Sequence, residues 1–261
     1  LIEGIAIAAY SMGATVAYNY IRGEFLNEPI PRFEYALKEA YAAGLLGKNI
    51  KESGIDFDLY TFVGAGAYIC GEETALLESL EGKPGKPRFK PPFPANYGLY
   101  GKPTTVNNTQ TLASVPVIMR NGASWFANLG PEGSGGMAQF SVSGHIEKPS
   151  NYELPMGIPF ENLLDLCGGI KGGRKLKAVI PGGSSVPVLP ADIIMDCTMD
   201  YNSLQNAGSS FGTGAVIVMD ENTCMVNVLR RISRFYMVES CGQCTPCREG
   251  TGWLYRMLTR I

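Results

Sequence analysis

Three cysteines near the end of the chain, spaced C-x2-C-x2-C, constrain its fold more than any other feature. Cys241, Cys244 and Cys247 lie in the run ESCGQCTPCREG. We expect this spacing to bring three thiolates to one point. Thr245 is the expected N-cap of a following helix and Pro246 its first residue, so the positive helix end would face the sulfurs. The pattern favours a metal cluster over a disulfide.

The remaining cysteines bear on the fourth ligand that an iron–sulfur cube requires. A ferredoxin-type run places that ligand three residues after the third cysteine, where this sequence has Thr251. The last ligand must therefore come from elsewhere. The four isolated cysteines, Cys70, Cys167, Cys197 and Cys224, are expected to be buried small side chains, although one of them could complete the cluster and Cys224 is nearest in sequence. This distribution is a poor disulfide scaffold and favours a reducing compartment.

The composition describes a globular chain with a substantial core. Its 261 residues are 45% hydrophobic and carry a formal charge of −2, without a basic stripe, which argues against nucleic acid as the main partner. The sequence contains no run of about 18 apolar residues, so no membrane span is predicted. The chain begins at Leu1 without a signal peptide pattern and ends in a helix without a capping signal, so we expect truncation at both ends.

The first half of the chain alternates between helical and strand patterns. A strand over Asp58–Val63 runs directly into a glycine-rich turn, and such alternation predicts an α/β domain with a mostly parallel sheet. The segment Gly82–Pro103 is rich in proline, glycine and lysine and predicts a long ordered loop. Before the turn, the expected elements are a helix at Ile2–Ala9, a strand at Thr15–Ile21 and a helix at Phe33–Ala43.

The second half predicts a linker, a small α+β unit and helices. Gly130–Gly136 has the composition of a linker, and a helix over 107–119 with a short one over 123–129 precedes it. Amphipathic helices are expected from Asn222 onward and again after the cysteine run. Within the α+β unit, the expected elements are strands at 138–146, 152–156, 175–180 and 215–219, with a helix at 159–166.

The strand, glycine-rich turn and helix from Gly64 to Leu80 form the second chemical feature. Such a turn exposes backbone N–H groups to a phosphate or a flat cofactor, although an ordinary tight turn explains the pattern as well. The motif is not a P-loop, because Glu72 occupies the position of the required lysine. It also departs from G-x-G-x-x-G, because the third glycine falls at Gly71.

Other candidate side chains have simple structural explanations. Glu72 and Glu73 are favoured at a helix start by the helix dipole, and Asn107 and Asn108 are typical helix caps. Tyr68 and Phe93 resemble packing aromatics as much as cofactor stackers. The single histidine, His145, is expected to be structural or solvent-facing. The sequence therefore offers no histidine for a Ser/His/Asp triad or a His–metal site.

Four motifs in order resemble the flavin- and NADH-binding subunit of respiratory complex I, known as the F-type subunit. They are GAGAYICGEETALLESLEG from Gly64, PPFP ending at Pro94, GKPTTVNN ending at Asn108 and ESCGQCTPCREGTG from Glu239. The resemblance covers essentially the whole chain. It implies an incomplete Rossmann-like α/β FMN/NADH domain over residues 1–136, a β-grasp-like α+β domain over 137–220 and a helical bundle with a [4Fe–4S] cluster over 221–261.

The resemblance also implies the cofactors and the residues that hold them. NADH would pass a hydride to FMN, and single electrons would pass to the cluster and on to quinone. Tyr68 and Glu73 are the catalytic candidates, with Glu73 near the nicotinamide ribose and Phe93 near the adenine. The cluster ligands would be Cys241, Cys244 and Cys247, with the fourth beyond the end of this chain. The expected FMN neighbours are Gly64, Gly66, Tyr68, Gly71, Glu72, Asn107 and Asn108.

The family further implies partners and a location. The thioredoxin-like E-type subunit and the G-type subunit of complex I would be the partners, on the cytoplasmic face of the membrane without insertion. The family's N-terminal glycine-rich loop would precede this chain, so we expect the chain alone to be inactive. The alternatives are a diaphorase subunit of an NAD-linked hydrogenase or formate dehydrogenase, and a structural zinc module; an NTPase is disfavoured by Glu72.

Overall fold

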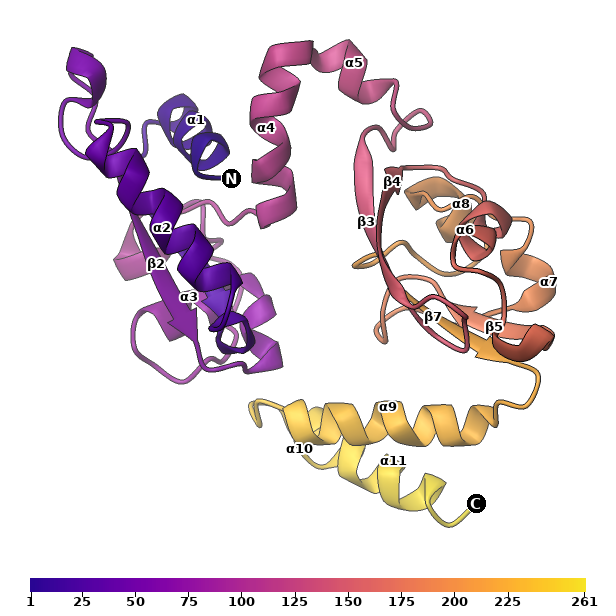
Figure 1. The fold of residues 1–261 in the computed structure, drawn as a ribbon. Helices are drawn as coiled ribbons and strands as arrows, with labels where there is room; N and C mark the ends of the chain where they lie inside the picture. Colours follow the sequence, from indigo (N-terminus) through magenta and orange to yellow (C-terminus); the bar gives the residue numbers. More distant parts are fainter. The chain divides into compact units, whose positions relative to one another are not determined.

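A computed structural model describes residues 1–261, which form two compact units that we describe separately (Figure 1). The N-terminal unit comprises Leu1–Met119 together with Ser233–Arg256, and the central unit comprises Arg120–Ile232 with Met257–Ile261. The N-terminal stretch of the first unit contains α1 (Ile2–Met12), β1 (Val16–Arg22), α2 (Pro29–Ala42), β2 (Asp58–Gly64), α3 (Glu73–Leu80) and α4 (Thr109–Asn121).

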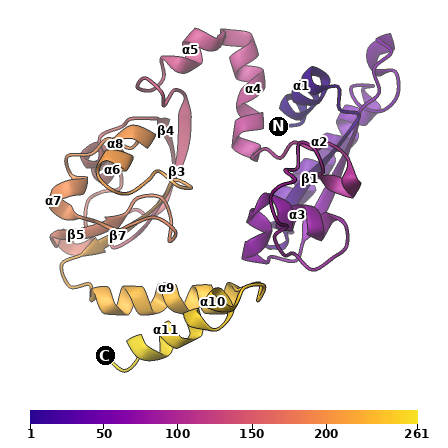
Figure 2. The same ribbon diagram turned by 180° about the vertical axis from the view of Figure 1, so that it is seen from behind.

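A parallel pair of strands forms the base of the N-terminal unit. β1 pairs with β2 from Val16 opposite Asp58 to Arg22 opposite Gly64. Parallel neighbours need a crossover, and α2 supplies it (Figure 2). Ile5 of α1, Leu37 of α2 and Leu59 of β2 are buried in one apolar cluster. The predicted α/β class with parallel strands is confirmed.

The predicted loop and helix after α3 are also present. Residues 82–104 contain one 3₁₀ turn, at Leu99–Gly101, and otherwise no regular structure. α4 packs closely against α1 at Gly4. A β-carbon on this glycine would lie 1.8 Å from the carbonyl oxygen of Leu112, so no larger residue fits there. The helix predicted over 107–119 therefore exists, shifted to begin at Thr109.

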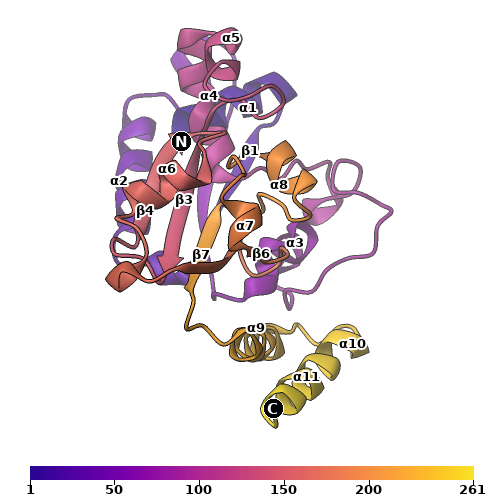
Figure 3. The same ribbon diagram turned by 90° about the vertical axis from the view of Figure 1, so that its right-hand side faces the viewer.

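The central unit is a mixed five-stranded sheet in the order β4–β3–β7–β5–β6, with helices packed on it (Figure 3). Phe160, Ile194 and Leu204 from three helices are buried against Phe140 and Val216 of the sheet. The predicted α+β unit is present, and sequence patterns missed its elements β6, α7 and α8. The elements are α5 (Ala123–Ala127), β3 (Met137–Gly144), β4 (Ser150–Pro155), α6 (Phe160–Leu166), β5 (Leu176–Ile180), β6 (Leu189–Pro190), α7 (Ala191–Ile194), α8 (Tyr201–Asn206) and β7 (Ala215–Asp220).

The segment Gly130–Gly136 is packed rather than a flexible linker, contrary to expectation. Ser134 is 2% exposed, and its hydroxyl accepts a hydrogen bond from the Tyr201 N–H at 3.4 Å. A β-carbon on Gly136, whose φ is +96°, would lie 2.2 Å from the Phe126 ring. The glycines here allow close packing and a left-handed turn, which composition alone does not distinguish from flexibility.

Three helices complete the chain: α9 (Met225–Glu239), α10 (Thr245–Arg248) and α11 (Gly250–Leu258). α11 packs on the C-terminal part of α9, where a β-carbon on Gly252 would lie 3.7 Å from the side chain of Met237 (Figure 1). The cysteine run forms the turn between them. None of the helices is long and apolar enough to cross a membrane.

Candidate functional site

The glycine-rich turn leaves the end of β2 at Gly64 and reaches α3 through a 3₁₀ turn at Tyr68–Gly71. Gly64 is buried, and a β-carbon on it would lie 2.4 Å from the Tyr20 hydroxyl oxygen. Gly66 has φ +89°, a backbone conformation that residues other than glycine rarely adopt. Gly71 is exposed, with no atom within 4 Å of the position a β-carbon would occupy. The backbone at Gly64 and Gly66 therefore requires glycine, whereas Gly71 leaves open space.

Glu72 closes the N-terminus of α3 to anions. Its Oε2 accepts hydrogen bonds from the backbone N–H groups of Thr74 and Ala75, both at 3.0 Å, and from the Thr74 hydroxyl. Burial favours the protonated acid, but these bonds and Lys90 outweigh it and lower the pKa of Glu72. The N–H groups of Thr74 and Ala75 are therefore not open to a phosphate, because the carboxylate caps them, whereas a role for the backbone of the glycine-rich turn stays a prediction.

A lysine from the proline-rich loop lies against both glutamates of the turn. The Lys90 Nζ is 3.1 Å from Glu72 Oε1 and 2.5 Å from Glu73 Oε1, and these two carboxylates raise the pKa of the lysine. One cation thus offsets part of two negative charges. Sequence reasoning missed Lys90; its signal was a lysine at the start of KPPFP, three residues before Phe93, the predicted adenine-stacking residue.

Tyr68 is in contact with the helix that leads into the cysteine run, within the same unit. Its ring packs edge-on against Phe235, with centroids 5.1 Å apart, and its N–H donates to Glu239 Oε2 at 3.2 Å. Burial and the neighbouring Tyr236 raise the pKa of Tyr68. A second link joins the Gln243 side chain to the carbonyl oxygen of Pro87 at 3.0 Å. These contacts bring the glycine-rich turn and the cysteine run together.

The other predicted flavin and NADH residues lie on the loop and at the start of α4. Phe93 is 55% exposed, so its ring face is available for stacking. Asn107 and Asn108 are exposed, and Asn108 Oδ1 accepts the Thr111 N–H at 2.7 Å, as a cap of α4 does. The structural explanation for Asn108 is thus confirmed, whereas a role at FMN stays a prediction.

Two cavities differ sharply in their lining. An open depression of about 510 Å³ is lined by Gly23, Glu24, Leu26 and the turn residues Val63–Gly66. A larger cavity of about 770 Å³ between α1 and α2 is lined almost wholly by apolar side chains such as Ile2, Leu46 and Phe57. Of these two cavities, the smaller one adjoins the glycine-rich turn, so a ligand held by the backbone of that turn would lie there.

The cysteine run forms an open turn in which the three thiols are free. Cys244 is exposed, Cys241 and Cys247 are partly exposed, and the Cys247 thiol donates to the Ser240 hydroxyl at 3.3 Å. The helix N-cap is Cys244 rather than Thr245, and α10 is only four residues long, so its dipole contributes less than expected. No three Cys, His, Asp or Glu side chains converge as a metal site, so the expected convergence of the thiols is absent in this conformation.

The donor set nevertheless fits a thiolate-bound metal. Three unpaired sulfurs within seven residues are soft ligands of the kind that hold iron–sulfur clusters or zinc. The isolated cysteines differ from the run in burial or in their distance along the chain. Cys70, Cys167 and Cys197 are buried, and Cys224 precedes the 15 residues of α9, which extend about 22 Å. The expectation that Cys224 is buried is wrong, because it is exposed.

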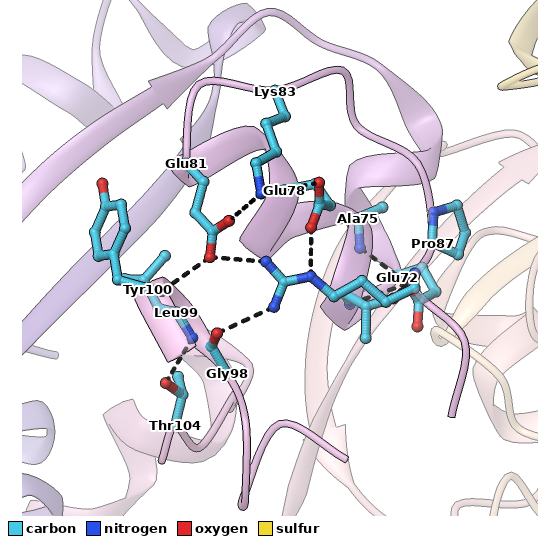
Figure 4. Close-up of polar contacts among 12 residues, drawn as sticks. Glu72, Ala75, Glu78, Glu81, Lys83, Pro87, Gly98, Leu99, Tyr100 and Thr104 are labelled. Carbon is cyan, nitrogen blue, oxygen red and sulfur yellow. Dashed lines mark hydrogen bonds and ion pairs between the residues drawn. The ribbon is translucent and has the colours of Figure 1, made fainter. Parts of the chain in front are cut away.

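An arginine network, which sequence reasoning also missed, holds the loop after α3 to that helix, and Figure 4 labels the carboxylates Glu78 and Glu81 that take part in it. Arg88 contacts Glu78, Glu81 and the carbonyl oxygen of Gly98. Burial would raise the pKa of Glu81, but hydrogen bonds from Lys83, Arg88 and the Tyr100 N–H lower it to about 2. A lone arginine in a loop gives no sequence signal of such a network.

Comparison with known proteins places these features in one family. A model of the Nuo51 FMN-binding domain matches residues 1–117, one of the SLBB domain matches 138–218, and one of the NADH-ubiquinone oxidoreductase-F iron-sulfur binding region matches 227–261. The chain is 56% identical over its full length to the F subunit of the NADH-quinone oxidoreductase of Rickettsia bellii and 56% identical to that of Rickettsia typhi. It spans 63% and 62% of the length of these relatives.

A solved structure with the same fold is a chain of the NAD⁺-reducing [NiFe]-hydrogenase in the H₂-reduced state. It superposes with a TM-score of 0.86 at 36% identity, over 98% of this chain and 42% of that one. The air-oxidized state gives a TM-score of 0.84 at 35% identity. Because the three family matches follow one another along nearly the whole chain, the chain belongs to the family of the F subunits of NADH-quinone oxidoreductase.

Proposed function

We propose that the full-length product of this gene oxidises NADH with FMN and passes the electrons singly to a [4Fe–4S] cluster and, through partner subunits, to quinone. The observation that carries this proposal is the joining of the glycine-rich turn to the cysteine run within one compact unit. Tyr68 contacts both Phe235 and Glu239, and these residues lead directly to Cys241. Two cofactors at these places would lie close enough for electron transfer.

The flavin side of the site positions rings rather than moving protons. When bound, FMN accepts a hydride and releases electrons one at a time. We assign Gly64, Gly66 and Gly71 to close backbone approach to it, and Asn107 and Asn108 to its polar edge or phosphate. Hydride transfer needs two stacked rings at a fixed distance and no general base, which agrees with the scarcity of histidine.

The nicotinamide side uses the charged residues of the turn. We assign Glu73 to the nicotinamide ribose, Phe93 to the adenine and Tyr68 to the neighbourhood of the flavin. We also assign Glu72 to the neighbourhood of FMN, although one of its carboxylate oxygens accepts the N–H groups that begin α3. Lys90 offsets the charge of both glutamates, so a dinucleotide phosphate approaching the turn does not meet two uncompensated anions.

The cluster side is supplied by Cys241, Cys244 and Cys247, whose free thiols are the ligands this chain offers. We propose the domain limits 1–136, 137–220 and 221–261 for the flavin, β-grasp-like and iron–sulfur parts. The proposed partners are the thioredoxin-like E-type subunit and the G-type subunit of complex I, at the cytoplasmic face of the membrane. The match to the F subunits over the full chain supports this setting.

A second candidate is a diaphorase subunit of an NAD-linked hydrogenase, which the structural match to the NAD⁺-reducing [NiFe]-hydrogenase supports. The identity of 36% to that protein is lower than the 56% to the F subunits, so we favour complex I. A structural zinc site would use the same thiols but would leave the glycine-rich turn without a function.

The test is an anaerobic absorption spectrum of the full-length product after reconstitution with iron, sulfide and FMN. We expect a flavin band that NADH bleaches, together with NADH-dependent ferricyanide reduction. Copurification of quinone reductase or hydrogenase activity with the native complex separates the two candidates. A colourless protein that contains zinc and does not oxidise NADH would overturn the proposal.

A further inference from the structure

Residues 82–104 form a loop without α-helix or strand that carries two side chains of the proposed NADH site, and the backbone hydrogen bonds within the loop all lie from Phe93 onward. Lys90 and Phe93 lie in its middle, on a stretch without helix or strand. Phe89 beside them is 87% exposed, so apolar packing does not hold this part of the loop. Whatever fixes the loop therefore determines where Lys90 and Phe93 lie.

Arg88 fixes both limbs of the loop to α3 at once. Its Nε contacts Glu78, its Nη2 lies 2.7 Å from Glu81 Oε1, and its Nη1 donates to the Gly98 carbonyl oxygen at 3.0 Å (Figure 4). The arginine and Glu78 side chains are each 19% exposed and that of Glu81 is 9% exposed. A planar guanidinium presents its donors in a rigid fork, so one side chain can bind two carboxylates and a carbonyl in different directions.

The returning limb of the loop is secured to the same carboxylate. Glu81 Oε1 also accepts the Tyr100 N–H at 2.8 Å, two residues after Gly98. Lys83 contacts Glu81 at 2.8 Å as well, but its side chain is 55% exposed and touches neither limb beyond the carboxylates. Arg88 and Lys83 thus share one anionic partner while only Arg88 crosses the loop.

The backbone of Arg88 continues the network into the proposed site. Its N–H donates to the Thr74 hydroxyl oxygen at 2.9 Å, and that hydroxyl donates to Glu72 Oε2. Two residues further along the chain, Lys90 reaches Glu72 and Glu73. The anchor at residue 88 and the two glutamates at the start of α3 are therefore parts of one connected set of hydrogen bonds.

We propose that Arg88 is a positioning residue for the dinucleotide: it holds the 82–104 loop on α3 so that Lys90 and Phe93 face the site formed with Glu73. The proposal rests on the NADH-oxidising function proposed above. Arg88 acts through Lys90 and Phe93 and does not itself touch NADH or FMN. Its loss should therefore weaken NADH binding while leaving the flavin and the hydride transfer at saturating NADH nearly intact.

The test compares Arg88→Lys with Lys83→Gln in the full-length, cofactor-loaded protein. Lysine keeps the charge but cannot make the three directed contacts, and we expect the KM for NADH to rise about tenfold with kcat and FMN content within about twofold. Hydrogen exchange should become faster across residues 89–103. Lys83→Gln, which removes an exposed contact to the same carboxylates, should leave all four quantities within about twofold of wild type.

Glu78→Gln provides a milder second variant in case Arg88→Lys is poorly folded, and it should shift KM in the same direction by a smaller factor. Unchanged KM and exchange in both variants would overturn the proposal, as would a fall in melting temperature without any change in KM. Wild-type protein that fails to oxidise NADH would instead refute the proposed function. In that case faster exchange in Arg88→Lys would still establish the anchor.

Discussion

The glycine-rich turn and the cysteine run belong to the same compact unit but are organised in opposite ways. Around the turn, Glu72 caps α3, Lys90 bridges two glutamates and Arg88 holds the loop, so protein groups satisfy one another. In the run, the three thiols are free, and the Cys247 thiol donates a hydrogen bond to Ser240. Glu239 and Gln243 of the run bind backbone groups of the turn and of the loop after α3. The turn is thus held by hydrogen bonds among protein groups, whereas the run presents three free thiols to which the cluster is proposed to bind.

This difference follows from the chemistry of the two ligands. FMN and NADH bind through many weak contacts, which require groups held in place beforehand. A cluster binds through metal–sulfur bonds whose free energy is large enough to organise a flexible turn.

The largest expected effect is on the metal side of the comparison. Cys244→Ser in the full-length protein should lower cluster iron and visible absorption by roughly tenfold or more, because a direct ligand is lost. Cys224→Ser is the matched control, since α9 separates Cys224 from the run, and it should retain its iron. Iron retained in Cys244→Ser, or lost in Cys224→Ser, would refute the ligand assignment.

On the flavin side, the largest effect concerns acid stability. The pKa of Glu81 is about 2 in the folded protein against 4.5 for the unperturbed group. A lowered folded pKa stabilises the protein fully above about pH 4.5, and this contribution, at most about 3 kcal/mol, is lost as pH falls toward 2. Glu81→Gln should therefore flatten the loss of stability between these values. Parallel unfolding curves for the two proteins across this pH range would contradict the network.

Two glycines of the turn give a matched pair of smaller effects. Gly66→Ala forces a β-carbon onto a residue at φ +89° and should cost about 1–2 kcal/mol of unfolding free energy. Gly71→Ala meets no atom within 4 Å and should leave stability unchanged. If Gly71 lies against FMN as proposed, its alanine variant should still lose flavin affinity. Equal stability of the two variants in chemical denaturation would show that the turn is not held as described.

The smallest expected effect is a difference in unfolding free energy between variants of Glu72 and Glu73. Glu72→Ala removes the cap of α3 and should cost about 1 kcal/mol, whereas Glu73→Ala removes only a contact to Lys90 and should cost less. Thermal unfolding of both variants measures the difference. A larger cost for Glu73→Ala would mean that the lysine bridge, rather than the cap, holds the turn.

The sequence predicted one region better than the other for physical reasons. The strand at Asp58, the turn and the loop after it were recognisable because hydrophobic alternation and proline act locally. The roles of Lys90 and Arg88 were not, because they depend on a chain reversal that brings together residues seven to eighteen positions apart. The convergence of the cysteines was overestimated, since spacing along the chain describes the set of sulfur donors and not where their side chains lie.

Hydrogen exchange in the full-length protein, with and without iron and sulfide reconstitution, tests the contrast between the two regions most directly. We predict that the cluster slows exchange strongly across residues 239–250 and leaves α3 and the Arg88 network unchanged. Exchange in the cysteine run that is already slow without metal, or α3 that becomes ordered only when the cluster forms, would contradict the distinction between a preformed flavin side and a metal-organised cluster side.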